Sequence, residues 1–127
     1  MINSQNYEFS FSGIKTSVLY YLRDNKKAKK EDVAASFQQA CLDVLVKKTM
    51  RAASEFNAKT VFICGGVAAN QQLRHQLSVM CNKSGVDFMS PANEYNTDNA
   101  AMIAAAAYLR YLRKTKYKMV ADSTMSL

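Results

Sequence analysis

Apolar residues recur at the spacing of an α-helix along much of the chain. One such pattern predicts a helix that opens at Ser12 or Gly13 and runs to about Arg23. The clearest pattern predicts a long helix from about Asp32 to Phe56, with Lys48 joining its apolar stripe only through its methylene chain. The stripe consists of apolar residues at helical spacing: Val33, Phe37, Cys41, Val44 and Leu45.

Two further helices are predicted in the second half of the chain. One starts near Ala69 and ends at Gly85, which stands where a left-handed C-cap belongs. Its apolar positions are Leu73, Leu77, Met80 and Cys81. The last helix, from Ala100 to about Arg113, is nearly all alanine on its inner side. Because alanine lets helices approach closely, we expect this helix to pack tightly against its neighbours.

Three short segments have the composition of strands. Tyr7–Ser12 alternates aromatic and polar residues, whereas Lys59–Cys64 is too apolar to be half exposed and predicts a buried strand of the parallel type. Val86–Met89 is the third, and Pro91 closes it. The resulting order indicates an α/β fold with a small, partly parallel sheet and packed helices. A sheet with so few strands usually belongs to something larger or pairs with a second copy.

The composition is that of one soluble globular domain. The chain has 127 residues, 49% of them apolar and 21% charged, which excludes a disordered tail, a collagen-like repeat and a disulfide scaffold. The longest apolar run, Ala100–Leu109, is about half the length of a bilayer span. The first residues have no basic start and no apolar stretch, so we expect no signal peptide, no membrane association and a cytoplasmic location.

Cysteine and histidine are sparse. Cys41, Cys64 and Cys81 are widely spaced, which argues against a disulfide framework and against a zinc site. We expect all three to be small buried hydrophobes. His75 is the only histidine and lies off the apolar stripe of its helix, so we expect it at the surface.

The net charge of +7 is concentrated in two short segments. Lys26–Lys30 carries four lysines and Arg110–Lys118 carries five basic residues, and neither segment contains an acid. Clustered positive charge attracts a phosphate backbone, although a solvated loop and a frayed helix end would have the same composition. The residues from 114 to 127 form a basic tail without a pattern, which we expect to be mobile.

A diglycine provides the strongest candidate for chemistry. Gly65 and Gly66 follow a predicted strand and precede a helix. Ligands of α/β sheets bind at the carboxyl ends of strands, where a diglycine allows close approach and a helix N-terminus favours phosphate. Asn70 offers a donor and an acceptor to a base or ribose. The glycines can equally make only a tight turn, and their spacing fits neither the Rossmann nor the P-loop pattern.

Thr97, Asp98 and Asn99 precede the alanine-rich helix. A common explanation is that Thr or Asp caps the helix and complements its dipole. The alternative is that Asp98 points into a cleft as a metal ligand, but one carboxylate cannot make a metal site and the chain offers few partners. From the residues alone, the prediction is a phosphate- or nucleotide-binding α/β lobe with a basic surface.

Four segments in a fixed order carry a resemblance to a known family. They are FSFSGIKTSVL (Phe9–Leu19), DVAASFQQACLDVLVKKTMRA (Asp32–Ala52), CGGVAANQQLR (Cys64–Arg74) and NTDNAAMIAAAAYLRY (Asn96–Tyr111). These segments resemble the TsaD family, the tRNA threonylcarbamoyladenosine transferases once labelled Gcp or O-sialoglycoprotein endopeptidase. The resemblance covers the chain from about Phe9 to Arg113.

The resemblance implies the two-lobed ATPase fold of actin, Hsp70 and sugar kinases, with residues 1–113 as part of the C-terminal lobe. It also implies transfer of a threonylcarbamoyl group from threonylcarbamoyl-adenylate to an anticodon-loop adenosine of tRNA. In the family, Asp98 of TDNAAM corresponds to a ligand of one iron or zinc ion. Asn70 corresponds to a nucleotide contact, and Gly65 and Gly66 to the lining of the same pocket.

The chain also departs from the family pattern. The other two metal ligands of the family form a His-x-x-x-His motif in the first lobe, and this chain has one histidine. Asn96 stands where the family often has cysteine. We therefore expect the chain alone to be inactive and to require the N-terminal lobe and related subunits of the tRNA-modification complex. The alternative is a non-catalytic binding module that pairs with a partner subunit or RNA, and an exposed interface would also favour a homodimer.

Overall fold

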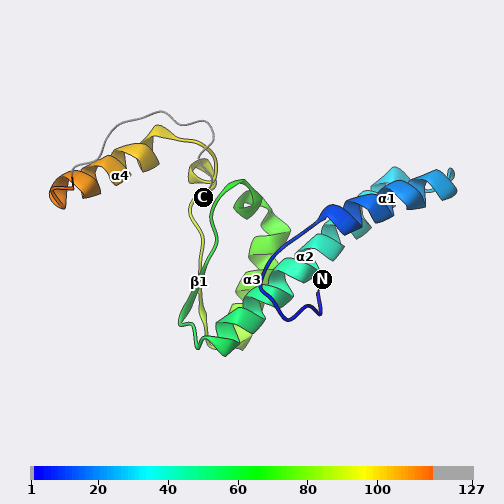
Figure 1. Ribbon diagram of the computed structural model, residues 1–127, viewed down its shortest axis with the longest axis horizontal. Helices are drawn as coiled ribbons and strands as arrows, with labels where there is room; N and C mark the ends of the chain where they lie inside the picture. The colour runs from blue at the N-terminus through cyan, green and yellow to red at the C-terminus, as the bar shows by residue number, and fades with distance from the viewer. Residues whose placement is uncertain (1, 116–127) are drawn as a thin grey trace.

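The fold consists of a helical arm joined to a small α/β body (Figure 1). The structure, a computed structural model, describes residues 2–115, so the predicted tail lies almost wholly outside the described residues. The elements are α1 (Ser12–Asp24), α2 (Lys30–Glu55), β1 (Thr60–Phe62), the 3-10 helix η1 (Gly66–Ala69), α3 (Gln71–Lys83), β2 (Asp87–Met89), the 3-10 helix η2 (Asn93–Tyr95) and α4 (Ala100–Leu112). The predicted helices are therefore confirmed.

The end of α3 is a left-handed glycine, as the sequence predicts. Gly85 has a φ of +67°. Its N–H donates to the Asn82 carbonyl at 3.3 Å, and the N–H of Val86 donates to the Cys81 carbonyl at 3.0 Å. These two bonds form a Schellman motif, which satisfies the last carbonyls of the helix. The chain then turns directly into β2.

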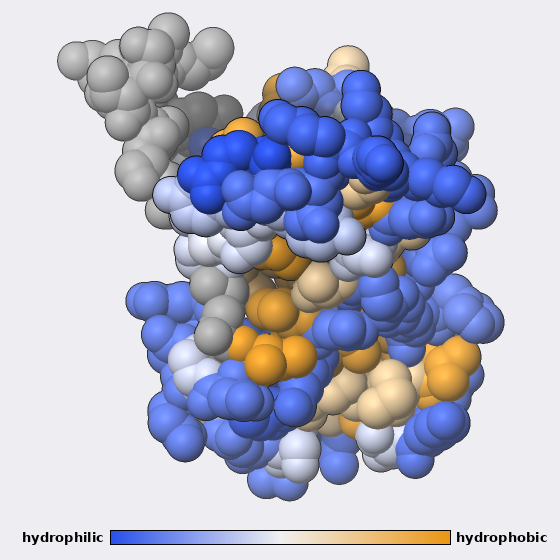
Figure 2. Space-filling view, turned by 90° about the vertical axis from the view of Figure 1, so that its right-hand side faces the viewer, coloured by the Kyte–Doolittle hydropathy of each residue, from blue (hydrophilic) through white to orange (hydrophobic). Residues whose placement is uncertain are grey.

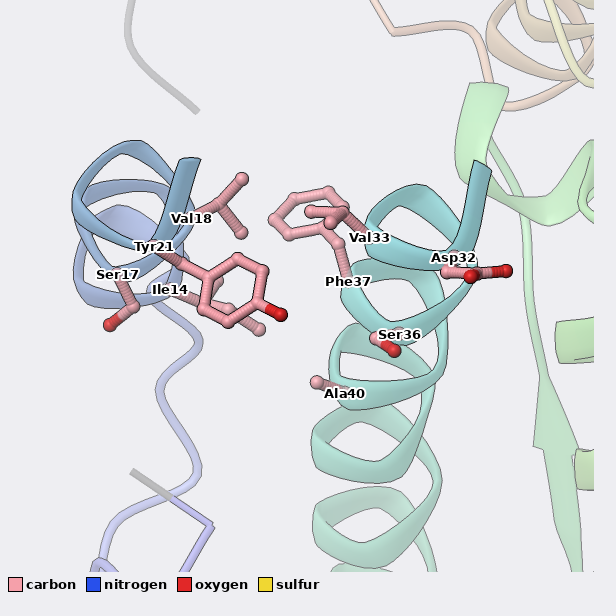
Figure 3. A pocket seen from close by; sticks show the side chains of 9 residues that line it. All are labelled: Ile14, Ser17, Val18, Tyr21, Asp32, Val33, Ser36, Phe37 and Ala40. Carbon is pink, nitrogen blue, oxygen red and sulfur yellow. The ribbon is translucent and has the colours of Figure 1, made fainter. Parts of the chain in front are cut away.

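Helices α1 and α2 form the arm, which projects away from the sheet (Figure 1). The arm comprises α1, the loop Asn25–Lys29 and the N-terminal half of α2. Ile14 and Val18 of α1 point toward Val33 and Phe37 of α2 (Figure 3). A hollow of about 480 Å³ remains between the two helices, and α1 has no buried residue. The arm is thus held by partial apolar contact.

The core lies where the C-terminal half of α2 packs on α3 and on one face of the sheet. Its buried apolar side chains are Leu42, Val46, Ala53, Val61, Leu73, Leu77 and Cys81. The stripe predicted on α2 only partly matches this core, because its residues from Val33 to Leu45 are half-buried. Val33 and Phe37 face the partly packed α1 across the hollow, whereas Leu45 packs at the margin of the core cluster.

The sheet has two parallel strands, with Val61 paired to Phe88 and Phe62 paired to Met89. The predicted parallel sheet is confirmed, but the prediction that β1 is buried on both sides is wrong. Val61 faces the core, whereas Phe62 is 59% exposed and Met89 is 57% exposed. The difference arises because helices α2 and α3 cover one face of the sheet and no described element covers the other.

The prediction of a strand at Tyr7–Ser12 is wrong, since residues 7–11 have no regular structure. Lys48 holds the N-terminal segment against α2 instead. Its side chain is 1% exposed, so its head is buried as well as its methylene chain. The ammonium donates to three oxygens: Ser4 Oγ at 2.8 Å, Asn6 Oδ1 at 3.2 Å and the Glu8 carbonyl at 2.6 Å.

Helix α4 has the predicted bounds but not the predicted packing. It has no buried residue and extends away from the sheet (Figure 1). Its exposed apolar residues include Met102, Ile103, Tyr108, Leu109, Tyr111 and Leu112. The expected tight packing is therefore wrong among residues 2–115, because no described element lies against the alanine face. None of the helices in this range combines the length and the apolar character needed to cross a membrane.

Candidate functional site

The predicted site residues lie on the two loops that follow the strands. Since β1 and β2 are parallel, their carboxyl ends lie at the same edge of the sheet. Gly65 and Gly66 follow β1, and Asp98 follows β2 by way of η2. Figure 1 shows both loops at this end of the molecule, above the sheet. The topology therefore brings the two motifs to one edge, as expected for a ligand site of an α/β fold.

The two glycines differ in backbone conformation. Gly65 has a φ of +81°, a conformation that side chains rarely adopt. Gly66 has no such constraint, and a Cβ built on it would meet nothing within 4 Å. A tight turn therefore accounts for Gly65 but not for Gly66. A residue without a side chain at Gly66 leaves its backbone open to close approach by a ligand.

Asn70 caps helix α3. Its Oδ1 accepts a hydrogen bond from the N–H of Leu73 at 3.0 Å, which satisfies one of the free donors of the first turn. The side-chain amide nitrogen donates to no described residue. Asn70 thus keeps a donor for a ligand, while its acceptor is already used by the helix. The remaining N–H groups at the start of α3 carry the positive end of the helix dipole.

Asp98 does not cap α4. Asn99 does so, because its Oδ1 accepts from the N–H of Met102 at 2.9 Å and its Nδ2 donates to the Thr97 carbonyl at 2.9 Å. Asp98 is exposed at the rim of a shallow hollow and makes no hydrogen bond or ion pair within residues 2–115. The capping explanation is therefore wrong for this carboxylate, which is left open to solvent.

Arg74 joins the two loops and was not recognised from the sequence as a site residue. Its Nε donates to the Ala68 carbonyl at 2.5 Å and its Nη2 donates to the Pro91 carbonyl at 2.9 Å. One guanidinium thus ties the glycine loop after β1 to the loop that leads to Asp98. Its place one turn after Asn70 puts it on the same side of α3, but no local pattern shows which carbonyls it meets.

Comparisons with known proteins identify the family. The family of tRNA N6-adenosine threonylcarbamoyltransferases, TsaD, matches residues 1–105. The chain belongs to the TsaD family. A tRNA N6-adenosine threonylcarbamoyltransferase of Thermosipho africanus is 45% identical to this TsaD chain over 127 residues, which cover 98% of the chain and 37% of the relative. The resemblance inferred from four motifs is thereby confirmed.

Two further relatives with the same name give the same picture. The protein of Thermosipho melanesiensis is 49% identical over 108 residues, 85% of the chain and 33% of the relative. That of Kosmotoga olearia is 48% identical over 103 residues, 81% of the chain and 31% of the relative. The TsaD chain spans about a third of the length of these curated relatives and matches their C-terminal part.

The described residues of this TsaD chain do not fit a complete metal site. No three His, Cys, Asp or Glu side chains within residues 2–115 are placed to hold one ion. A stable zinc site needs three or four ligands held together. Asp98 can therefore supply one ligand, and the others would have to come from outside residues 2–115. His75 is exposed on α3, as predicted.

Asn96 is an unusual feature of the loop that carries Asp98. It is 3% exposed, and neither its Oδ1 nor its Nδ2 has a hydrogen-bond partner within the described part of this TsaD chain. A buried polar group without a partner costs about 1–3 kcal/mol. The loop between β2 and α4 is therefore held at a cost, which the bridge from Arg74 to Pro91 helps to offset.

The cysteines of the TsaD chain provide a test of this geometry. Cys64, next to Gly65, is exposed, Cys41 is half-buried and Cys81 is buried, so the expectation of three buried cysteines is wrong for Cys64. Burial raises the pKa of the Cys41 and Cys81 thiols and lowers their thiolate fraction. We expect iodoacetamide at about pH 8 to label Cys64 first, and Cys81 only after unfolding in urea.

Mass spectrometry of peptides quantifies this labelling over time. The urea-unfolded chain is the control, because all three thiols are then equally accessible. Labelling of Cys81 as fast as Cys64 in the folded chain would contradict the packing of α3 on α2.

Proposed function

We propose that this chain is the C-terminal part of a tRNA N6-adenosine threonylcarbamoyltransferase and forms one wall of its nucleotide site. The single observation that carries this proposal is the convergence of two loops at one sheet edge. One loop offers Gly65, Gly66 and Asn70, and the other offers the open carboxylate of Asp98. Arg74 links them through backbone carbonyls. Family membership supplies the class of reaction.

The ligand proposed for this wall is threonylcarbamoyl-adenylate. Its phosphate would lie near Gly66 and the first turn of α3, where backbone N–H groups and the helix dipole favour an anion. The Asn70 amide nitrogen would donate to the ribose or the base. In the reaction, the N6 amine of the tRNA adenosine attacks the carbamoyl carbon and a C–N bond forms. The bond from that carbon to the phosphate oxygen breaks, the amine loses one proton to solvent, and AMP leaves with the bonding electrons. The chain's residues hold the adenylate in position for this attack.

Asp98 is proposed to contribute one ligand to an iron or zinc ion in the assembled enzyme. Its carboxylate is exposed and committed to no described partner, which suits a ligand that meets its ion only on assembly. When bound, such an ion would neutralise charge on the adenylate. The chain alone is proposed to be inactive, since Asp98 belongs to no group of three or more His, Cys, Asp or Glu side chains in the described residues that could hold an ion.

We further propose that residues 1–113 are part of one lobe of an actin-like ATPase fold, completed by an N-terminal lobe. Two features support an incomplete structure. The sheet has two strands with one bare face, and two-stranded sheets are marginal by themselves. Helix α4 exposes its apolar residues along its whole length. A second lobe, related subunits or a second copy of the chain would cover such surfaces.

A binding titration with a non-reactive analogue of the adenylate tests the nucleotide site. The chain is mixed with the N-terminal portion of the Thermosipho africanus relative, and affinity is measured by calorimetry. Asn70→Ser keeps a capping oxygen but removes the amide donor, so we expect a loss of about 5–10-fold, the worth of one hydrogen bond. Asn82→Ser, the same change at the exposed far end of α3, should have no effect.

Asp98→Asn tests the metal ligand in the same mixture. Because the amide keeps the size of the side chain but removes its charge, we expect at least a tenfold loss of zinc affinity, on the order of 1.4 kcal/mol or more. The chain without the N-terminal portion should bind zinc weakly, with or without the substitution. Unchanged zinc and analogue binding for both Asn70→Ser and Asp98→Asn would overturn the proposed site.

The second candidate function is a non-catalytic module that docks on a related subunit or on RNA. The exposed apolar surface of α4 favours it. The two functions differ in what Asp98 does, because a docking module has no use for its carboxylate. Binding of a partner that is indifferent to both Asn70→Ser and Asp98→Asn, together with no analogue binding, would favour the module.

A further inference from the structure

The end of the arm is a basic exposed surface outside the candidate site. From Lys30 to the first core residue, Leu42, α2 measures about 18 Å, so the loop Asn25–Lys29 lies well beyond the core. Figure 1 shows this end at the opposite side of the molecule from α4. Four exposed lysines gather there: Lys26, Lys27, Lys29 and Lys30. None of them forms an ion pair within residues 2–115.

The loop that presents these lysines is a defined turn. The N–H of Ala28 donates to the Asn25 carbonyl at 3.0 Å. The backbone N–H and the Nδ2 of Asn25 both donate to the Tyr21 carbonyl, at 2.9 and 3.0 Å. These bonds close the end of α1 and fix the direction in which the loop leaves it. A fixed loop loses less entropy when its lysines bind a partner.

Three acids lie close to the lysines and set the net charge of the arm's end. Asp24 is paired with Arg23 at 2.7 Å. Glu31 and Asp32 stand in the first turn of α2, where the helix dipole favours them. Residues 23–32 therefore carry five basic and three acidic side chains, a net charge of +2. The lysines form the tip, and the unpaired acids lie behind them on the helix.

Exposed aromatic rings adjoin the tip. Tyr20 is 56% exposed and Tyr21 is 51% exposed, both in the last turns of α1. The guanidinium of Arg23 lies over the ring of Tyr20, with its Cζ 4.9 Å from the ring centroid. Figure 2, which looks at this side of the molecule, shows strongly hydrophilic surface over much of this end. The tip thus combines cations with faces on which a base can stack.

We infer that the tip of the arm binds the RNA substrate through its phosphate backbone and an unpaired base. This inference rests on the proposed function, from which it takes tRNA as the partner. A nucleotide at the strand ends is too small to reach the tip, whereas a folded RNA can contact both places. Lysines supply the phosphate contacts, and exposed tyrosines supply stacking for loop bases. The combination favours RNA over an anionic lipid surface, which would not use the ring faces for stacking.

Fluorescence anisotropy with the full chain and a labelled, unmodified tRNA transcript tests this inference. The variant K26Q/K27Q/K29Q/K30Q should weaken binding at least tenfold and reduce the salt slope, by about 0.7–0.9 for each phosphate that a lysine no longer neutralises. The matched control K15Q/K47Q/K59Q/K83Q removes the same charge from exposed lysines outside the tip and should weaken binding less than about twofold. The opposite change, E31Q/D32N, should strengthen binding.

Stacking is tested by Tyr20→Ala and Tyr21→Ala. Each should weaken binding of the tRNA several-fold but leave binding of an RNA duplex without loops unchanged. Circular dichroism establishes that the variants keep their helices. Equal weakening by the tip variant and the control would overturn the inference and indicate a response to net charge. Tip-dependent binding to vesicles rich in phosphatidylserine, with none to tRNA, would overturn it in favour of a membrane surface.

The outcome is separable from that of the proposed function. The tip variant should leave binding of the adenylate analogue unchanged, since the tip and the strand ends lie on different parts of the molecule. If the chain binds the analogue but the tip variant binds tRNA as tightly as the unmodified chain, only the arm inference is overturned. If the analogue does not bind, the proposed nucleotide site fails, but a loss of tRNA binding in the tip variant would still support the arm inference.

Discussion

Replacing Leu77 with alanine is expected to destabilise the folded chain by about 3–5 kcal/mol. Leu77 is 1% exposed and lies at the centre of the cluster with Leu42, Val46 and Leu73. The cost combines the lost burial with the cavity left behind, because α2 and α3 cannot close it without moving the sheet. The free energy of unfolding of a small domain is about 5–15 kcal/mol, so this substitution removes a large share of it.

Urea unfolding followed by circular dichroism measures the effect. Leu19→Ala is the matched control, since Leu19 is 69% exposed on α1 and should change stability by no more than about 0.5 kcal/mol. The candidate site should be lost together with the fold, because Asn70 caps α3 and Arg74 lies one turn further along it. Similar urea midpoints for Leu77→Ala and Leu19→Ala would contradict the burial of Leu77 in the core.

The helices were predictable because their signals are local. Apolar spacing and the left-handed Gly85 each act within a few residues of chain. The pairing of β1 with β2 was also predictable, since two short apolar strands joined by a helix favour a parallel arrangement. Local chemistry therefore accounts for the element order from α1 onward.

The wrong predictions concern surfaces that need distant partners. Tyr7–Ser12 has a strand pattern, but a strand needs a neighbour, and Lys48 and Arg51 hold this segment along α2 instead. The alanines of α4 and the exposed ring of Phe62 have the composition of buried residues without anything described to bury them. Residue type indicates whether a side chain favours burial, but tertiary contacts determine whether that side chain is buried.

The residues of the candidate site could be proposed from the sequence, but the hydrogen bonds that connect its two loops could not. The diglycine, Asn70 and Asp98 could be singled out because strand ends and helix starts have known uses. Arg74 could not, since its role depends on the Pro91 carbonyl, which the fold brings close from the far side of β2. The buried, unpartnered amide of Asn96 is another tertiary property, invisible in a polar loop sequence.

Replacing Lys48 with methionine is expected to loosen the N-terminal segment and to lower stability by about 2–3 kcal/mol. Methionine keeps most of the side-chain length, so the change isolates the ammonium. That group is buried and donates to Ser4 Oγ, Asn6 Oδ1 and the Glu8 carbonyl. Hydrogen bonds from charged donors are among the stronger ones, and no other described cation can replace all three.

Lys47→Met is the control for this change, because Lys47 is the exposed neighbour on the same helix. Limited proteolysis should cut Lys48→Met within residues 2–11 at protease concentrations that leave Lys47→Met intact. Arg51 also donates to the Ser4 and Asn6 carbonyls, at 2.8 and 2.6 Å. The segment should therefore detach from α2 only part of the time. Equal proteolysis of the two variants would mean that Arg51 alone holds the segment, and that burial of the Lys48 ammonium contributes nothing to the fold.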